Sequence, residues 1–316
     1  MMDGKKPSTI VGGSHPSVAT RSRKLRRYRP GEVRAAVYLL IPSFIGFVMF
    51  LLFPALRGLY MSLTDWDLMT DPRFIGFENY RRLIADRYFW NSLQVTVRYV
   101  IYNVPLQTLI SLSIALLMNH LKRSTSLRMV ALLPYFIPNV VIGLLFLVLL
   151  HPVIGPVNLA LESIGLSRIQ FLRLPSTALP SIVGINIWRH MGYIALLFFA
   201  GLQMIPNELY EAARIDGASA LQSFYKITLP LLRPVVTFVV ITAVIGSFQI
   251  FDTVAVTTEG GPIRSTEVLI WFIFQHAFQR FDMGYGATAT MVLFLILIVF
   301  TLIYMKVSRG GKSDLA

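Results

Sequence analysis

Six long apolar runs, each nearly free of charge, constrain this sequence more than any other feature. Each is close to or above the roughly 20 residues that an α-helix needs to cross the hydrocarbon core of a bilayer. Helices are expected because lipid cannot satisfy exposed backbone groups. The second run is expected to begin a turn or two before its charge-free part. The predicted spans are Ala35–Leu56, Tyr99–Leu121, Met129–Leu150, Pro180–Gln203, Pro234–Phe251 and Met283–Met305.

The composition agrees with an all-α integral membrane protein that has six transmembrane helices. The chain is 55% hydrophobic and 14% charged, with a mean hydropathy of +0.62. A soluble domain has roughly 25% charged residues. The chain has no cysteine, which excludes disulfides and thiolate chemistry.

The basic residues predict the orientation. With both termini inside, the cytoplasmic segments hold 18 Lys and Arg and the outer loops hold 9. This bias predicts that both termini are cytoplasmic. It also accounts for the net charge of +13 without a nucleic-acid partner.

Three regions follow from these patterns. Residues 1–34, rich in Gly, Ser, Pro, Lys and Arg, are predicted to be a disordered cytoplasmic arm. Its basic cluster could touch anionic lipid, although a tail that only sets topology is the simpler interpretation. Residues 35–306 form the six-span transmembrane domain, and residues 307–316 form a cytoplasmic tail. The first span reads as uncleaved, because it is too long and starts too late for a signal peptide.

The cytoplasmic loop 204–233 carries charge between two apolar runs, and its first part predicts a short helix. Asn207 is a good N-cap residue, and the acidic Glu208 and Glu211 suit the first turn of a helix. Gly217 can adopt the left-handed conformation that ends such a helix.

The second part of this loop predicts another short helix after a corner. Ser219 and Gln222 have the spacing of a capping box. Pro230 and Pro234 are expected to close the segment. Four residues are predicted to share one face, namely Leu221, Phe224, Tyr225 and Thr228. A polar helix–corner–helix with an apolar stripe, placed between two membrane spans, suggests a surface that a partner grips.

The fourth span carries four polar residues on one helical face. Asn186, Arg189, His190 and Tyr193 are spaced i, i+3, i+4 and i+7. A charge at this depth is costly and usually faces a bundle interior or a water-filled path. We therefore predict that this face lines a solute cavity. The alternative is that Arg189 extends to the outer interface beside Trp188.

Other polar and helix-breaking residues give weaker signals. Ser247 and Gln249 in the fifth span are further candidates for the solute path. Pro134 and Pro138 in the third span predict a kinked or broken helix. The scattered histidines do not have the spacing of metal ligands, so no metal site is predicted.

Nucleotide hydrolysis is not predicted for this chain. A phosphate-binding loop needs G-x-x-x-x-G-K-[ST]. The one GKS sequence begins at Gly311, and the residue five positions earlier is Lys306 rather than glycine. No catalytic constellation is found elsewhere, so the chain is not expected to be an enzyme. If ATP drives its function, another chain must hydrolyse it.

The central loop resembles the EAA loop of bacterial ABC importer permeases, in the form found in the carbohydrate branch. The matching positions are Glu211-Ala212-Ala213, Asp216-Gly217-Ala218, Phe224, Ile227, Leu229-Pro230 and Pro234. Other stretches resemble the maltose-type group, namely Phe74–Tyr80, Phe199–Leu202, Ile205-Pro206, Thr258–Pro262 and Gly284–Ala287. The resemblance covers residues 35 to 306. Unlike the maltose permease, the chain lacks additional N-terminal spans and a large outer insertion.

This resemblance implies a type I importer in the bacterial cytoplasmic (inner) membrane. Its partners would be a second, homologous permease, two ATP-binding subunits and an extracytoplasmic solute-binding protein. ATP and Mg²⁺ would be used by the ATPase subunits, and this chain would bind no cofactor. The implied ATPase-coupling residues are Glu211, Ala212, Ala213, Asp216, Gly217, Ala218 and Phe224. Gly260, Gly261 and Pro262 would contact the binding protein.

The resemblance also implies a solute class. A sugar, first of all an oligosaccharide, would stack on Tyr193 and hydrogen-bond to Asn186, Arg189 and Gln249. Arg189 leaves an anionic solute such as glycerol 3-phosphate as an alternative. A secondary transporter is disfavoured, because it would show internal repeats and intramembrane carboxylates. A structural scaffold would not need the charged central loop.

Overall fold

The structure is a computed structural model that describes residues 30–121 and 125–308. The chain divides into two compact units, Met1–Pro54 and Ala55–Ala316. The described part of the first unit contains α1 (Pro30–Phe47) and the π-helix η1 (Val48–Leu52). Helix α1 begins at Pro30, before the predicted end of the disordered arm at residue 34. The rest of that arm and the end of the predicted tail lie outside the described residues.

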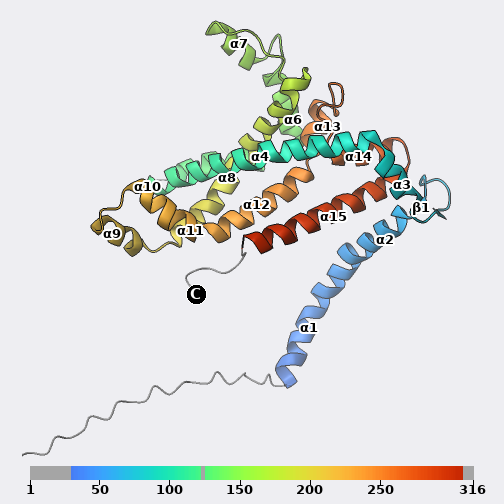
Figure 1. Cartoon of the computed structure of the whole chain (residues 1–316), viewed down its shortest axis with the longest axis horizontal. Coiled ribbons are helices and arrows are strands. Elements are labelled where there is room, and N and C mark those ends of the chain that lie inside the picture. Colours follow the sequence, from blue (N-terminus) through green and yellow to red (C-terminus); the bar gives the residue numbers. More distant parts are fainter. Residues whose placement is uncertain (1–29, 122–124, 309–316) are drawn as a thin grey trace, which may run out of the picture. The chain divides into compact units, whose positions relative to one another are not determined.

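The second unit is almost entirely helical (Figure 1). An antiparallel pair of two-residue strands, β1 (Thr64–Asp65) and β2 (Arg73–Phe74), pairs Thr64 with Phe74. The helices are α2 (Phe53–Ser62), which starts at the boundary between the units, α3 (Glu78–Ala85), α4 (Arg87–His120), α5 (Thr125–Phe136), α6 (Asn139–Leu149), α7 (Pro156–Ser163), α8 (Pro175–Gln203), α9 (Asn207–Ile215), α10 (Ala220–Ser223), η2 (Phe224–Thr228), α11 (Leu229–Leu231), α12 (Arg233–Phe248), α13 (Asp252–Thr257), α14 (Leu269–Phe274), η3 (Gln275–Gln279) and α15 (Met283–Val307).

The predicted six-span architecture is confirmed. Five helical segments of the described chain are long and apolar enough to cross a membrane, and the pair α5 and α6 supplies a sixth span. The unbroken segments are Val37–Ser62, Arg87–His120, Pro175–Gln203, Arg233–Thr257 and Met283–Val307.

The third span is broken, as its prolines predict. Helices α5 and α6 meet at an angle of 95°. Pro138 lies directly before α6 and has an extended conformation, with ψ at 139°. Proline has no N–H to donate and disfavours a helical conformation in the preceding residue, so the helix stops and restarts here.

Helix α4 is the longest element and the centre of the packing in the second unit. It packs against α8, α12 and α14 (Figure 1), and α8 also packs against α5. Its first residues extend beyond the charge-free run because Asp86 caps the helix, accepting a hydrogen bond from the Tyr88 amide at 2.8 Å. Tyr99, fully buried, joins α4 to a cluster that includes Ile182 of α8 and Val254 of α13.

Helices α5 and α8 approach each other closely enough to require a glycine. A Cβ atom added at Gly192 would overlap the carbonyl group of Ala131. Small residues at such crossings let two membrane helices bring their backbones together. Gly184, on the same helix, has open space at the corresponding position.

Candidate functional site

A polar cavity of about 180 Å³ lies among α4, α5, α8 and α12. Its lining brings together four of the six residues predicted for the solute path, Asn186, His190, Tyr193 and Ser247. The remaining lining residues are Asn103, Gln107, Tyr135, Ile194, Thr242, Ala243 and Gly246. Hydroxyl, amide and aromatic groups therefore meet at one place inside the transmembrane region.

One wall of the cavity is aromatic. The rings of Tyr135 and Tyr193 stack with centroids 4.5 Å apart and an interplanar angle of 9°. His190 meets the edge of this pair, 5.9 Å from the Tyr135 ring. Tyr135 stands just before the break between α5 and α6, and it was not predicted as a site residue. Such a stacked pair offers an apolar, polarizable surface with hydroxyl groups at its margin.

Other lining residues of the cavity form a chain of side-chain hydrogen bonds. Asn186 Nδ2 donates to Asn103 Oδ1 at 3.0 Å, and Asn103 Nδ2 donates to Gln107 Oε1 and Ser247 Oγ, each at 2.9 Å. Asn103 and Gln107 were not predicted from the sequence to line the solute path. Their i, i+4 spacing inside the apolar second span was the signal that could have identified them.

Two predicted solute-path residues do not line this cavity. The Arg189 guanidinium donates to His190 Nε2 at 2.7 Å and to the Tyr135 carbonyl at 3.3 Å. Arg189 also lies over the Tyr135 ring, 5.2 Å from its centroid. Arg189 therefore contacts two residues of the cavity lining, His190 and Tyr135, without lining the cavity itself. Gln249 is exposed at the C-terminal end of α12, outside the lining.

The central loop forms the predicted helix–corner–helix. Gly217 has φ of +76°, and the Ala218 amide donates to the Ala213 carbonyl at 2.8 Å. This is the left-handed ending expected for α9. The capping box of α10 is also present, with the Ser219 amide donating to Gln222 Oε1 at 2.8 Å. The predicted N-cap was wrong, because Asn207 is the first residue of α9 and Pro206 precedes it without a side-chain cap.

The predicted apolar stripe of this loop was also wrong. Leu221 and Tyr225 are exposed, whereas Thr228 is buried and its hydroxyl lies 2.9 Å from that of Tyr210. The reason is η2, whose wider π-helical turn rotates the following residues away from the α-helical register. Of the two prolines, Pro230 lies near the end of a helical run that is continuous from Ala220 to Leu231, and Pro234 lies in the first turn of α12.

The exposed surface of the loop combines apolar and charged side chains. Ile215 is 87% exposed, and Leu221, Tyr225 and Glu211 are also exposed. A hollow of about 410 Å³ lies beside the corner. It is lined by Ala213, Asp216, Gly217, Ala218, Gln222, Ser223, Lys226 and Ile227. Exposed apolar groups beside charges are typical of a protein contact surface.

The loop between α13 and α14 contains the three residues predicted to contact a binding protein, Gly260, Gly261 and Pro262. Gly260 is buried with φ of +83°, and a Cβ there would crowd the Trp271 indole. Gly261 and Pro262 are half-buried, while the adjacent Ile263 is 89% exposed. The glycines thus shape the loop, and Ile263 forms its exposed tip. Burial raises the pKa of Glu267 in this loop, against the effect of the Arg264 guanidinium 3.1 Å away.

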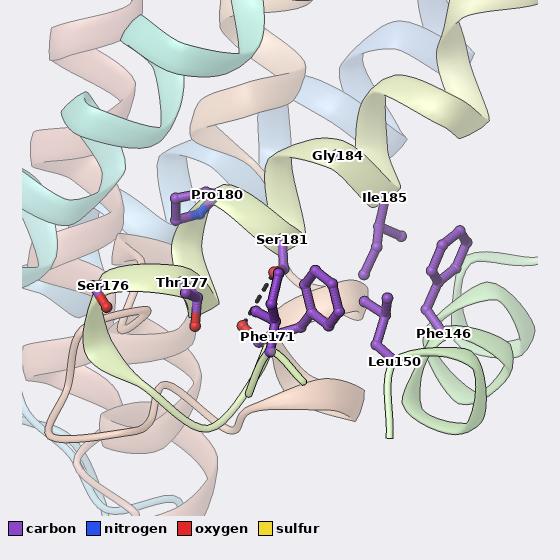
Figure 2. A pocket seen from close by; sticks show the side chains of 10 residues that line it. Phe146, Leu150, Phe171, Ser176, Thr177, Pro180, Ser181, Gly184 and Ile185 are labelled. Atoms are coloured by element: carbon purple, nitrogen blue, oxygen red, sulfur yellow. Dashed lines mark hydrogen bonds between the residues drawn. The ribbon is translucent and has the colours of Figure 1, made fainter. Parts of the chain in front are cut away.

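A second cavity, of about 440 Å³, lies near the start of α8 (Figure 2). Carbon atoms dominate its lining, which includes Phe146, Phe171 and Ile185. Two of its hydroxyls already serve the fold, since Thr177 donates to the Gln170 carbonyl at 2.7 Å and Ser181 to the Phe171 carbonyl at 3.1 Å. This cavity offers a polar solute fewer contacts than the smaller one.

Comparison with known proteins agrees with this arrangement. Residues 107–310 match the family described as "binding-protein-dependent transport system inner membrane component". A trehalose/maltose transport system permease protein of Thermococcus litoralis is 33% identical, over 91% of this chain and 97% of that protein. An sn-glycerol-3-phosphate transport system permease protein of Shigella flexneri is 32% identical, over 85% of this chain and 92% of that protein.

A solved structure shares the fold. A chain of a bacterial ABC transporter involved in the import of alginate superposes with a TM-score of 0.78 at 24% identity, covering 88% of this chain and 96% of that one. The family match agrees with the two structural features described above, the broken third span and the exposed helix–corner–helix. The chain belongs to the family of inner membrane components of binding-protein-dependent transport systems, and it has the fold of an ABC importer permease.

Proposed function

We propose that this permease conducts a sugar through the polar cavity among α4, α5, α8 and α12. The observation that carries this proposal is the cavity lining, in which stacked tyrosines face a set of amides and hydroxyls. Sugars bind through apolar faces that stack on aromatic rings and through hydroxyls that both donate and accept. The relative from Thermococcus litoralis, named for trehalose and maltose, supports the same solute class.

Glycerol 3-phosphate is the second candidate, because Arg189 lies directly behind the cavity and a relative is named for that solute. No Lys or Arg is among the residues that line the cavity. An anion would therefore require Arg189 to leave His190. For this reason the sugar is favoured.

The energy source in this proposal lies in other subunits. The coupling residues Glu211–Ala213, Asp216–Ala218 and Phe224 would sit against an ATP-hydrolysing subunit, and two such subunits would serve this chain and a second permease. An extracytoplasmic binding protein would deliver the solute to the outer loop around Ile263. Both termini would be cytoplasmic and the membrane would be the bacterial inner membrane, as the distribution of Lys and Arg favours.

The test is uptake by the complete transporter in proteoliposomes, with maltose, trehalose and sn-glycerol 3-phosphate as probes. Asn186→Ala and Tyr193→Ala are expected to lower the number of solute molecules imported per ATP hydrolysed about tenfold, because each removes a cavity contact worth roughly 1–1.5 kcal/mol.

Leu302→Ala, at an exposed position of α15 outside the cavity lining, is the control for solute retention and should leave the import-to-ATP ratio unchanged. Uptake of sn-glycerol 3-phosphate but neither sugar would contradict the proposed solute class. Unchanged ratios in both cavity variants would show that these residues only pack the fold.

A further inference from the structure

Asn103 is a buried amide whose hydrogen bonds join three transmembrane helices. It is 1% exposed, on α4 at the level of the cavity. Its oxygen accepts from Asn186 on α8, while its nitrogen donates both hydrogens, one to Gln107 on α4 and one to Ser247 on α12. An amide nitrogen has two hydrogens, so this group has no donor left for a solute.

Each partner of Asn103 uses one group in this network and keeps the rest of its hydrogen-bonding capacity. Gln107 uses its oxygen, which leaves its NH₂ group. Ser247 accepts from Asn103, which leaves its own O–H to donate. Asn186 uses one N–H, which leaves its oxygen to accept and its second N–H to donate. Within the described chain these remaining groups have no hydrogen-bond partner, and all three residues line the cavity.

We propose that Asn103 is a positioning residue that sets the hydrogen-bonding polarity of the solute cavity. Its orientation fixes which groups stay free among the cavity-lining residues, namely the NH₂ group of Gln107, the O–H of Ser247, and the oxygen and second N–H of Asn186. The inference rests on the proposed function, since it concerns the solute that this cavity admits. Asn103 itself need not touch that solute.

This polarity favours a particular class of solute. A hydroxyl group both accepts and donates, so neighbouring hydroxyls of a polyol can satisfy the free donors and the free acceptor together. A group that only accepts, such as a phosphate dianion, could accept from the free N–H and O–H groups but would leave the Asn186 oxygen without a donor. In a low-dielectric interior such mismatches cost more than they do in water.

The alternative is that Asn103 only holds the helices together, as buried polar groups do in membrane proteins. A purely structural role and a positioning role predict different effects on import and on ATP hydrolysis. Loss of a helix contact lowers stability and activity together. Loss of cavity polarity lets the solute escape outward while ATP is still hydrolysed.

The experiment uses Asn103→Leu in the complete transporter in proteoliposomes, with whichever of maltose, trehalose or sn-glycerol 3-phosphate the wild type imports. The number of solute molecules imported per ATP is expected to fall about tenfold, with binding-protein-stimulated ATP hydrolysis within about twofold of wild type. Asn103→Ser, which retains a small polar group and can hold only one of the three partners, should show a loss in the same direction.

Ser111→Ala is the matched control, because Ser111 is a buried residue of α4 whose hydroxyl has no partner in the described chain. It should behave as wild type. The double variant Asn103→Leu/Asn186→Leu should lose less than the product of the two single losses, because the contact between Asn103 and Asn186 is shared by both changes.

An unchanged import-to-ATP ratio in both Asn103 variants would overturn the inference, as would a parallel loss of import and ATP hydrolysis, or additive effects in the double variant. These outcomes differ from failure of the proposed function. Import of sn-glycerol 3-phosphate alone would contradict the sugar and would still allow Asn103 to be tested with that solute.

Discussion

The Glu211→Ala variant is expected to reduce solute uptake roughly thirtyfold or more while the spans remain inserted. Glu211 is exposed on α9, beside the exposed apolar side chains of Ile215 and Leu221. Removing one member of a charge pair that becomes buried in an interface costs about 2–5 kcal/mol, where 1.4 kcal/mol is a factor of ten. Uptake and co-purification of the ATPase subunits measure the effect.

Glu208→Ala is the control for Glu211→Ala. It removes the same charge from the same helix one turn earlier, and it is expected to retain most of the uptake. Normal uptake in Glu211→Ala would contradict the assignment of Glu211 as a contact residue for the ATPase subunit. An equal loss in both variants would show that the charge of the helix matters and the position of Glu211 does not.

Gly192→Ala is expected to destabilise the transmembrane domain strongly. The new Cβ would overlap the Ala131 carbonyl, so α5 and α8 would have to separate. Overpacking of this kind costs about 1–3 kcal/mol or more, and the backbone of a helix cannot yield as a side chain can. Thermal unfolding of the purified complex in detergent should show a fall in Tm of several degrees.

Gly184→Ala tests whether that loss comes from the close approach. Gly184 lies on the same helix with nothing near its Cβ position, and alanine favours a helix over glycine. Its Tm should stay equal to that of the wild type or rise. Equal Tm values for Gly192→Ala and the wild type would mean that α5 and α8 are not packed as described.

The spans, the C-terminal end of α9 and the start of α10 were predictable because they depend on local chemistry. Pro138 acts on its own backbone and on the preceding residue, so the broken third span follows from sequence. The same holds for the corner at Gly217 and for the capping box of Ser219 and Gln222. In each case the interacting groups lie within a few residues of one another.

The cavity was only partly predictable because it depends on which helix faces meet. The i, i+3, i+4, i+7 pattern identified Asn186, His190 and Tyr193, but no local rule says which residues of α4 lie opposite them. Asn103 and Gln107 can be recognised as cavity residues only when the packing of α4 against α8 is known. Arg189 shows the converse, since it shares the predicted face yet bonds to His190 and the Tyr135 backbone.

The stripe on the central loop failed for another physical reason. Its prediction assumed 3.6 residues per turn throughout, but residues 224–228 form a π-helix. The change of register turns Thr228, which is buried, away from the exposed Leu221 and Tyr225. A π-helical turn depends on the surrounding packing, so residue spacing alone does not reveal it.

The central claim is that ATP hydrolysed in separate subunits acts on this permease through the loop at residues 204–233. The most direct measurement is uptake of maltose and trehalose by proteoliposomes that contain this chain, the second permease and the ATPase subunits, with the binding protein outside. The account predicts uptake only when ATP and the loaded binding protein are both present, and its loss in Glu211→Ala. Uptake that proceeds without ATP under an ion gradient would contradict it.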